Sequence, residues 1–209
     1  MLRILRVLGL ALAGTLVLSA VADDAPSPAQ QLAATLGAIE SMQGRFTQRQ
    51  FDERGELLLE SSGEFRMLRP GYFSWEIQSP DSQIVIANPQ HLWHYDRDLE
   101  TATRRPVTEE GELAPLKILG GDLDSLHRRF DIEAAAGGGF VLRPREPGLG
   151  FRQLQVSLEG PLLASMQVTD DAGQQISIEF LEVRGDAGLV AADFNFTPPP
   201  HADVFYHDR

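Results

Sequence analysis

The sequence predicts an α+β fold that is mainly β, in a single domain: a strongly curved antiparallel sheet of about 11 strands with about three short helices over its concave face. Three observations lead to this prediction. Apolar and polar side chains alternate through most of the chain, short turns rich in Gly, Pro, Asn and Asp separate the alternating segments, and helical spacing is confined to two stretches. Because twist accumulates from strand to strand, a flat sheet of this size would be unusual, and we expect a trough.

The chain begins with the three parts of a secretory signal peptide. Arg3 and Arg6 give a charged start, residues 7–19 are apolar, and Ala20-Val21-Ala22 is a cleavage site of small residues. The apolar part is shorter than the roughly 20 residues that cross a bilayer, so it is not a membrane span. We expect cleavage after Ala22, which leaves one exported domain of residues 23–209.

Charge and cysteine content exclude several classes of function. The 18 Lys and Arg residues against 30 Asp and Glu give a formal net charge of −12, and loss of Arg3 and Arg6 makes the mature chain more negative still. Such a protein is repelled by nucleic acids and by anionic membrane surfaces. The sequence has no cysteine, which excludes disulfides, thiolate metal sites and a lipid-modified thiol. Burial of apolar side chains must therefore stabilise the fold.

A helix is predicted from Ser27 to about Met42. Ser27 is a good N-cap, Pro28 takes the first helical position, and Gln30 completes a capping box. Apolar residues then recur every three or four positions and form one face, which must cover another element. They are Leu32, Leu36, Ile39 and Met42.

From Gly44 the period changes from helical to two, which indicates strands. The turns between them are short and permit only antiparallel neighbours. Residues 109–129 interrupt this pattern with one or two short helices around Gly120-Gly121, and in the tail, residues 194–200, prolines exclude a central strand. After the strand that begins at Gly44 and ends at the turn 52–55, the expected strands are 56–68, 71–79, 83–88, 91–96, 99–106, 128–135, 139–145, 151–158, 161–169 and 174–184.

The segment from Gly63 to Tyr95 contains both tryptophans, and one of its arginines, Arg69, stands directly before Pro70. Three sets of apolar residues share a strand face within it. Such sets are more often ordinary core than the wall of a ligand cavity, and an arginine at a strand turn is usually a surface residue. The sets are Phe65 with Met67; Phe73, Trp75 and Ile77; and Ile84 with Ile86.

Residue spacing gives little support to catalysis or metal binding. The sequence has no G-x-S-x-G turn, and the odd offset of His91 and His94 points them to opposite faces of a strand. His201 and His207 lie in the tail, and most acidic residues lie in turns, so we expect no catalytic residue, metal or cofactor. A hydrolase or glycan-binding enzyme that uses acids in the same trough stays open as an alternative, as does a purely structural interaction domain.

Four segments, in order along the chain, carry a resemblance to a known family. They are Phe46-Thr47-Gln48, Arg69-Pro70 followed by Phe73 and Trp75, Leu92-Trp93 followed by Tyr95-Asp96, and Phe194-Asn195-Phe196-Thr197-Pro198-Pro199. Together they resemble the LolA family of periplasmic outer-membrane lipoprotein carriers over almost the whole mature chain. The resemblance implies an unclosed antiparallel half-barrel, capped by helices, with an apolar cavity for the acyl chains of lipoproteins.

The resemblance also implies partners and site residues. Carriers of this family receive lipoproteins from the inner-membrane LolCDE complex and deliver them to the outer-membrane receptor LolB; we expect a monomer that is not an enzyme. In the family the arginine of the Arg-Pro turn hydrogen-bonds lid carbonyls, which implies a latch at Arg69 with partners near Leu36, Leu119 and Gly120. The residues expected to line the cavity are Leu32, Phe46, Phe65, Phe73, Trp75, Ile84, Ile86, Trp93 and Leu116.

Overall fold

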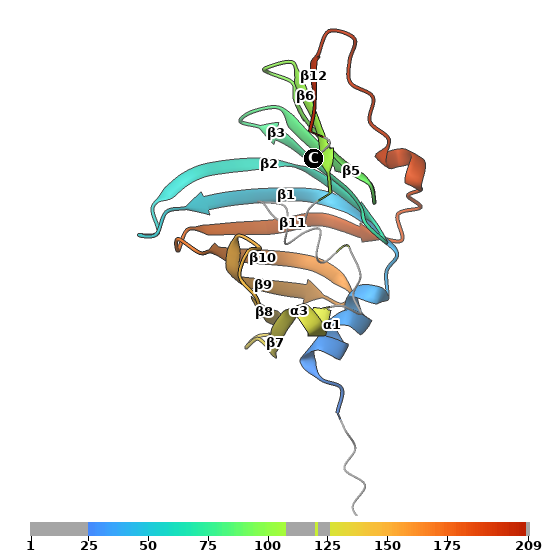
Figure 1. The fold of residues 1–209 in the computed structure, drawn as a ribbon. Coiled ribbons are helices and arrows are strands. Elements are labelled where there is room, and N and C mark those ends of the chain that lie inside the picture. The colour runs from blue at the N-terminus through green and yellow to red at the C-terminus, as the bar shows by residue number, and fades with distance from the viewer. Residues whose placement is uncertain (1–24, 108–119, 121–125, 208–209) are drawn as a thin grey trace, which may run out of the picture.

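A computed structural model describes residues 25–107, 120 and 126–207. In this part of the chain one 12-stranded sheet bends from β12 at one edge to β7 at the other without closing (Figure 1). The predicted mainly β half-barrel is therefore confirmed. Its strands are β1 (Ser41–Phe51), β2 (Leu57–Leu68), β3 (Tyr72–Ser79), β4 (Gln83–Ala87), β5 (His91–Asp96), β6 (Thr101–Pro106), β7 (Phe130–Ala134), β8 (Phe140–Pro144), β9 (Phe151–Glu159), β10 (Leu162–Asp170), β11 (Gln175–Gly185) and β12 (Asp203–Tyr206).

The sheet consists of two meanders joined along one seam. Its order is β12-β6-β5-β4-β3-β2-β1-β11-β10-β9-β8-β7, so β1 to β6 follow one another, and β7 to β11 do the same. The seam is the antiparallel pair β1–β11, in which Met42 lies opposite Gly185 and Phe46 opposite Phe180. The observed strand bounds lie within a few residues of the predicted ones.

Two parts of the C-terminal segment were not predicted from the sequence. Residues Ala191–Phe194 form a short 3-10 helix, η2, and β12 pairs in parallel with β6, with Asp203 opposite Thr101. The predicted antiparallel half-barrel therefore has one parallel strand pair, at this edge. The prolines at 198–200 precede β12, which lies at the sheet edge, where proline-rich segments are tolerated.

The capping box predicted at Ser27 is present in helix α1 (Pro28–Gly37), but the predicted end of that helix is wrong. The Ser27 hydroxyl accepts from the Gln30 amide, and the Gln30 side chain accepts from the Ser27 amide. The helix ends at Gly37, because Met42 already belongs to β1, where it lies opposite Met67 of β2. Ile39 and Met42 are buried as predicted, but Ile39 belongs to the linker after the helix and Met42 belongs to β1.

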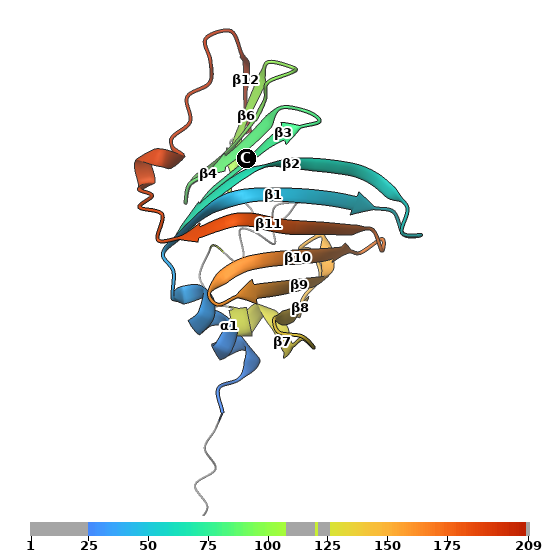
Figure 2. The ribbon, with the colours of Figure 1, turned by 180° about the vertical axis from the view of Figure 1, so that it is seen from behind.

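A second helix, α3 (Leu126–Arg129), takes the first residues of the strand predicted at 128–135, so that β7 begins at Phe130. Helix α1 lies against α3 and β7, near one edge of the sheet (Figure 2). Apart from Gly120 and α3, the helical segment predicted at 109–129 lies outside the described residues.

The two faces of the sheet carry separate apolar clusters. The inner cluster joins Leu32 and Leu36 of α1 to the inward side chains of most strands. The outer cluster lies on the opposite face of β4 to β6 and is covered by the C-terminal segment, whose Phe194 and Phe196 pack on aromatic rings of β3 and β5. Its buried members are Leu68, Ile84, Ile86, Tyr95, Ala102 and Phe194.

Candidate functional site

Arg69 lies at the end of β2, where it meets the exit of helix α1. Its backbone amide donates to the carbonyl oxygen of Glu40 at 2.9 Å, and its Nε donates to the carbonyl oxygen of Ile39 at 3.3 Å. Both acceptors belong to the linker between α1 and β1. One residue therefore ties the β2–β3 turn to the end of the helix.

The same turn also reaches Gly120. The Gly71 amide donates to the Gly120 carbonyl oxygen at 3.2 Å. A Cβ atom at position 120 would lie 2.9 Å from Sδ of Met67, so the residue type glycine permits this close approach. The turn Arg69-Pro70-Gly71 thus contacts chain segments on two sides.

Partial burial changes the electrostatics of Arg69. Removal of the guanidinium from water lowers its pKa to about 10, well below its ordinary value. The group stays charged at neutral pH, and a carbonyl dipole near a desolvated charge stabilises it. Arg69 is therefore not an ordinary surface arginine, because its guanidinium is partly buried and bonded to a backbone carbonyl.

Aromatic rings at the centre of the inner cluster pack on one another. The Trp75 ring stacks on Phe46 with 3.6 Å between centroids, and Phe73 and Phe65 lie at 6.0 and 6.4 Å from it. Phe180 of β11 meets Phe65 edge to face. Phe180 was not among the predicted cavity residues; its place in an alternating strand that pairs with β1 opposite Phe46 is the signal that could have identified it.

Comparison with known proteins assigns this architecture. Residues 37–197 match the family model described as outer membrane lipoprotein carrier protein LolA. The chain belongs to the LolA family. The outer-membrane lipoprotein carrier protein of Azotobacter vinelandii is 35% identical over 90% of this chain and 96% of its own length. The protein of that name from Pseudomonas aeruginosa UCBPP-PA14 is 33% identical, with 98% of both chains covered.

A solved structure supports the fold of this LolA-family chain. A conserved protein from Thermus thermophilus superimposes with a TM-score of 0.55, covering 87% of this chain and all of that one, at 13% sequence identity. At this identity the likeness concerns the fold alone.

The positions predicted from the LolA resemblance for the latch are brought together only in part. Gly120 contacts the Arg-Pro turn, through the amide of Gly71. Leu36 is buried in the inner cluster, and the carbonyl bound by Arg69 Nε belongs to Ile39, three residues later. Leu119 lies outside the described residues.

Three of the residues predicted to line the cavity lie on the wrong face of the sheet. Ile84 and Ile86 belong to the outer cluster, and Trp93 packs against it. The register explains this, because Val85 is the residue opposite Trp75, and the neighbours of Val85 in β4 must point to the other side. Alternation in a single strand does not reveal which face is inner, so the sequence could not decide it. Leu116 lies outside the described residues.

The other five predicted cavity residues meet in the inner cluster and are almost fully buried. Within the described residues they are packed side chain against side chain, so this part of the inner face is a closely packed apolar core. A ligand can reach it only if some of these contacts part. The five residues are Leu32, Phe46, Phe65, Phe73 and Trp75.

Several acidic side chains in the described ranges hold turns, and others, such as Glu60 and Glu76, form ion pairs on strands. Asp52 Oδ1 accepts from the amides of Arg54 and Glu56, and Asp96 Oδ1 accepts from those of Asp98 and Leu99. Residues 25–107, 120 and 126–207 contain no group of three or more His, Cys, Asp or Glu side chains that could hold a metal. In the same ranges no helix is long and apolar enough to cross a membrane.

Proposed function

We propose that the protein is a periplasmic carrier that binds the acyl chains of outer-membrane lipoproteins on its inner face, and that it performs no catalysis. Membership of the LolA family is the observation that carries this proposal. The inner cluster offers a continuous apolar surface, and the acids Asp52 and Asp96 hold turns. We place the mature chain in the periplasm after cleavage behind Ala22.

Arg69 acts in this proposal as the latch of the empty carrier. Its bond to the Ile39 carbonyl and the bond from Gly71 to Gly120 hold three chain segments together at one end of the inner cluster. A hydrogen bond from a charged group contributes about 1.5–3 kcal/mol. A closed state stabilised by this amount opposes lipid entry and favours lipid release, because the ligand must bind the open state better by more than that.

The free energy gained when acyl chains leave water is so large that release of the cargo requires a closed state that competes with lipid binding. Three acyl chains with roughly 45 methylenes would gain roughly 36 kcal/mol on full transfer from water, at about 0.8 kcal/mol per methylene. The tightest non-covalent complexes reach about 18–21 kcal/mol. A carrier that buries its cargo only in part and regains its own core contacts on release can hand the cargo on.

Donor and acceptor follow from the same proposal. The protein would receive its cargo from the inner-membrane LolCDE complex and pass it to LolB, as a monomer. Its negative charge disfavours adsorption to anionic membrane surfaces between the two.

Native mass measurement of the protein purified from the periplasm tests the proposal. We expect a species with one acylated lipoprotein per carrier, enriched when LolB is depleted. A carrier that travels empty under LolB depletion contradicts the proposal. The hydrolase alternative predicts turnover of a glycan or ester substrate by the same preparation, and no displaceable apolar ligand.

A further inference from the structure

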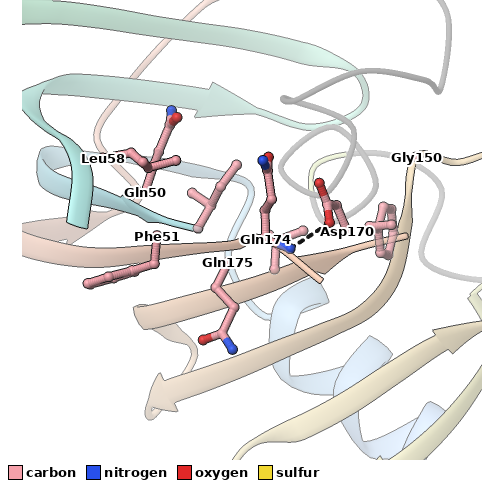
Figure 3. Close-up of a pocket in the computed structure, with 10 residues that line it drawn as sticks. Gln50, Phe51, Leu58, Gly150, Asp170, Gln174 and Gln175 are labelled. Carbon is pink, nitrogen blue, oxygen red and sulfur yellow. Dashed lines mark hydrogen bonds between the residues drawn. The ribbon is translucent and has the colours of Figure 1, made fainter. Parts of the chain in front are cut away.

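A hollow of about 260 Å³ opens at the end of β1 that lies far from Arg69 (Figure 3). It lies between the β1–β2 hairpin, the loop before β9 and the β10–β11 turn. Ser41, at the start of β1, pairs with Leu68 next to Arg69, whereas Phe51, at the other end, lines the hollow. A strand of 11 residues spans about 36 Å, so the two places are well separated. We call this hollow the distal mouth; its apolar lining residues are Phe51, Leu58, Phe151, Val168 and Ile176.

The distal mouth leads directly to the inner cluster. Phe151 and Val168 line the hollow and are also buried members of that cluster, and Ile176 packs against it. An apolar ligand in the hollow therefore touches the same continuous apolar surface that contains Trp75. The hollow at the molecular surface is therefore continuous with the core of the half-barrel through apolar side chains that belong to both.

A β-bulge places an additional leucine at this mouth. Gln50 pairs with Leu59, and Phe51 pairs with Leu57, so Leu58 is the extra residue of β2. By simple alternation from Leu68, Leu58 would point to the outer face, but it lines the hollow together with Gln50, because a bulge re-aims the side chains around it. Leu58 is 59% exposed and Leu57 is 55% exposed, so the rim presents apolar side chains to water.

The polar part of the rim consists mainly of amides. Gln50 and Gln174 contribute neutral side chains, whereas the side-chain oxygen of Gln175 already accepts from Nε2 of Gln167 at 2.8 Å. The carboxylate of Asp170 accepts from the backbone amide of Gln174 at 2.8 Å and holds the turn. Neutral amides are suited to hydrogen-bond the ester or amide groups at the neck of a lipid, whereas Asp170 disfavours a free carboxylate.

The volume sets how much ligand fits. An apolar cavity of about 150 Å³ is sufficient for benzene. The distal mouth, at about 260 Å³, is larger than that but below the roughly 300–1,000 Å³ of sites for drug-sized ligands. It accommodates a segment of one acyl chain and not a whole lipid.

We propose that the distal mouth is the entry port for one acyl chain, with the neck of the lipid at the amide rim and the chain directed past Phe151 towards Trp75. This inference rests on the proposed carrier function and adds a route to it. Entry takes place at the apolar end of the inner cluster, while the Arg69 end stays hydrogen-bonded until the chain separates the core side chains.

Site-directed fluorescence tests the port, since a chain without cysteine permits single-cysteine labelling. Leu58→Cys carries a bimane fluorophore, and Leu99→Cys, at a leucine 72% exposed in the β5–β6 turn, is the matched control. The ligand is methyl stearate with a nitroxide either near the ester or near the methyl end, and the tryptophan emission of the unlabelled protein reports binding. We expect quenching at position 58, stronger with the nitroxide near the ester, and none at position 99.

Each other outcome decides against the port. Binding reported by the tryptophans without quenching at position 58 overturns the port but leaves the carrier function intact. Stronger quenching by the nitroxide at the methyl end reverses the orientation and overturns entry at this site. No binding of either ester contradicts the carrier function itself. Displacement by an unacylated apolar peptide but not by phosphatidylcholine would assign the mouth to a protein partner.

A charge at the rim provides a second test that does not depend on labelling. We expect Leu58→Glu to weaken binding of unlabelled methyl stearate about tenfold, which corresponds to about 1.4 kcal/mol, because the carboxylate must be desolvated next to the chain. Leu99→Glu, with the same change in charge, should leave binding unchanged. Equal affinities for the two variants would overturn the port.

Discussion

The two ends of the β1–β2 strand pair differ in how far they bury the apolar side chains of the sheet. At the Arg69 end, Met42 and Met67 are buried, and backbone carbonyls receive bonds from Arg69 and Gly71. At the distal end a bulge interrupts the pairing, and Leu57 and Leu58 extend into water. One end is thus held by directional polar bonds and the other is open with an apolar rim. In the proposed carrier, the Arg69 end holds the empty core together and the distal end admits a ligand.

Truncation of one residue at each end should produce the largest contrast. We expect Met42→Ala to lower the free energy of unfolding by about 2–5 kcal/mol, because it leaves a cavity in the packed inner cluster. Leu57→Ala, at the exposed rim, should change it by about 0.5 kcal/mol or less. Urea denaturation of both variants measures the difference. Similar losses would mean that the rim is buried in solution and that the two ends are alike.

Replacement of Arg69 tests the held end in function. Arg69→Leu removes the bond from Nε to the Ile39 carbonyl, which contributes about 1.5–3 kcal/mol to the closed state, so the variant should retain lipoprotein about tenfold more tightly and transfer it poorly to LolB. Transfer between purified proteins is the measurement. Leu58→Ala, at the other end of the strand pair, is the control and should release cargo at least as well as the wild type. Transfer by Arg69→Leu at the wild-type rate would show that this residue is not a latch.

A methyl group at Gly120 should loosen the same end by a smaller amount. The new Cβ atom would lie 2.9 Å from Sδ of Met67, and the flexible thioether can move, so we expect Gly120→Ala to cost about 1 kcal/mol. Combination with Met67→Ala provides the space and should remove most of this cost relative to Met67→Ala alone. An additive double variant in urea denaturation would contradict the contact.

The pH dependence of the held end should be the smallest effect. Burial lowers the pKa of Arg69 to about 10, below its ordinary value, so this group makes folding more favourable only as the pH rises above about 10. Between about pH 6 and pH 8 it is charged in both states. The difference in unfolding free energy between the wild type and Arg69→Leu should therefore be constant over that range. If this difference changes between pH 6 and pH 8, an ionisable group other than Arg69 must contribute to the contacts at this end of the strand pair.

Local signals in the sequence predicted most of the elements, and the errors have physical causes. The capping box at Ser27 and the turns between strands depend on neighbouring residues, and both were predicted correctly. The end of α1 was not, because pairing of Met42 with Met67 overrides helical spacing. Strand β12 was missed, since a parallel edge strand after three prolines has no local signature.

The site was less accessible to sequence than the fold. Ile84, Ile86 and Trp93 alternate as inner-face residues do, and only the register with β3 places them on the outer face. The distal mouth depends on a one-residue bulge at Leu58 and on loops from three distant parts of the chain. No periodicity in a single strand contains that information.

The seam between β1 and β11 has a consequence for the order in which the fold is completed. Each meander is made of neighbouring hairpins, whose contacts are local, but Met42 meets Gly185 only when nearly the whole chain is present. Contacts between such distant residues form slowly, because the loop that joins them must first be closed. An N-terminal leader would bring β1 out of the inner membrane first and β11 among the last strands. Until β11 is in place, one edge of β1 is unpaired and can pair with a strand of another chain. A chaperone that covers this edge would prevent such pairing until the fold is complete.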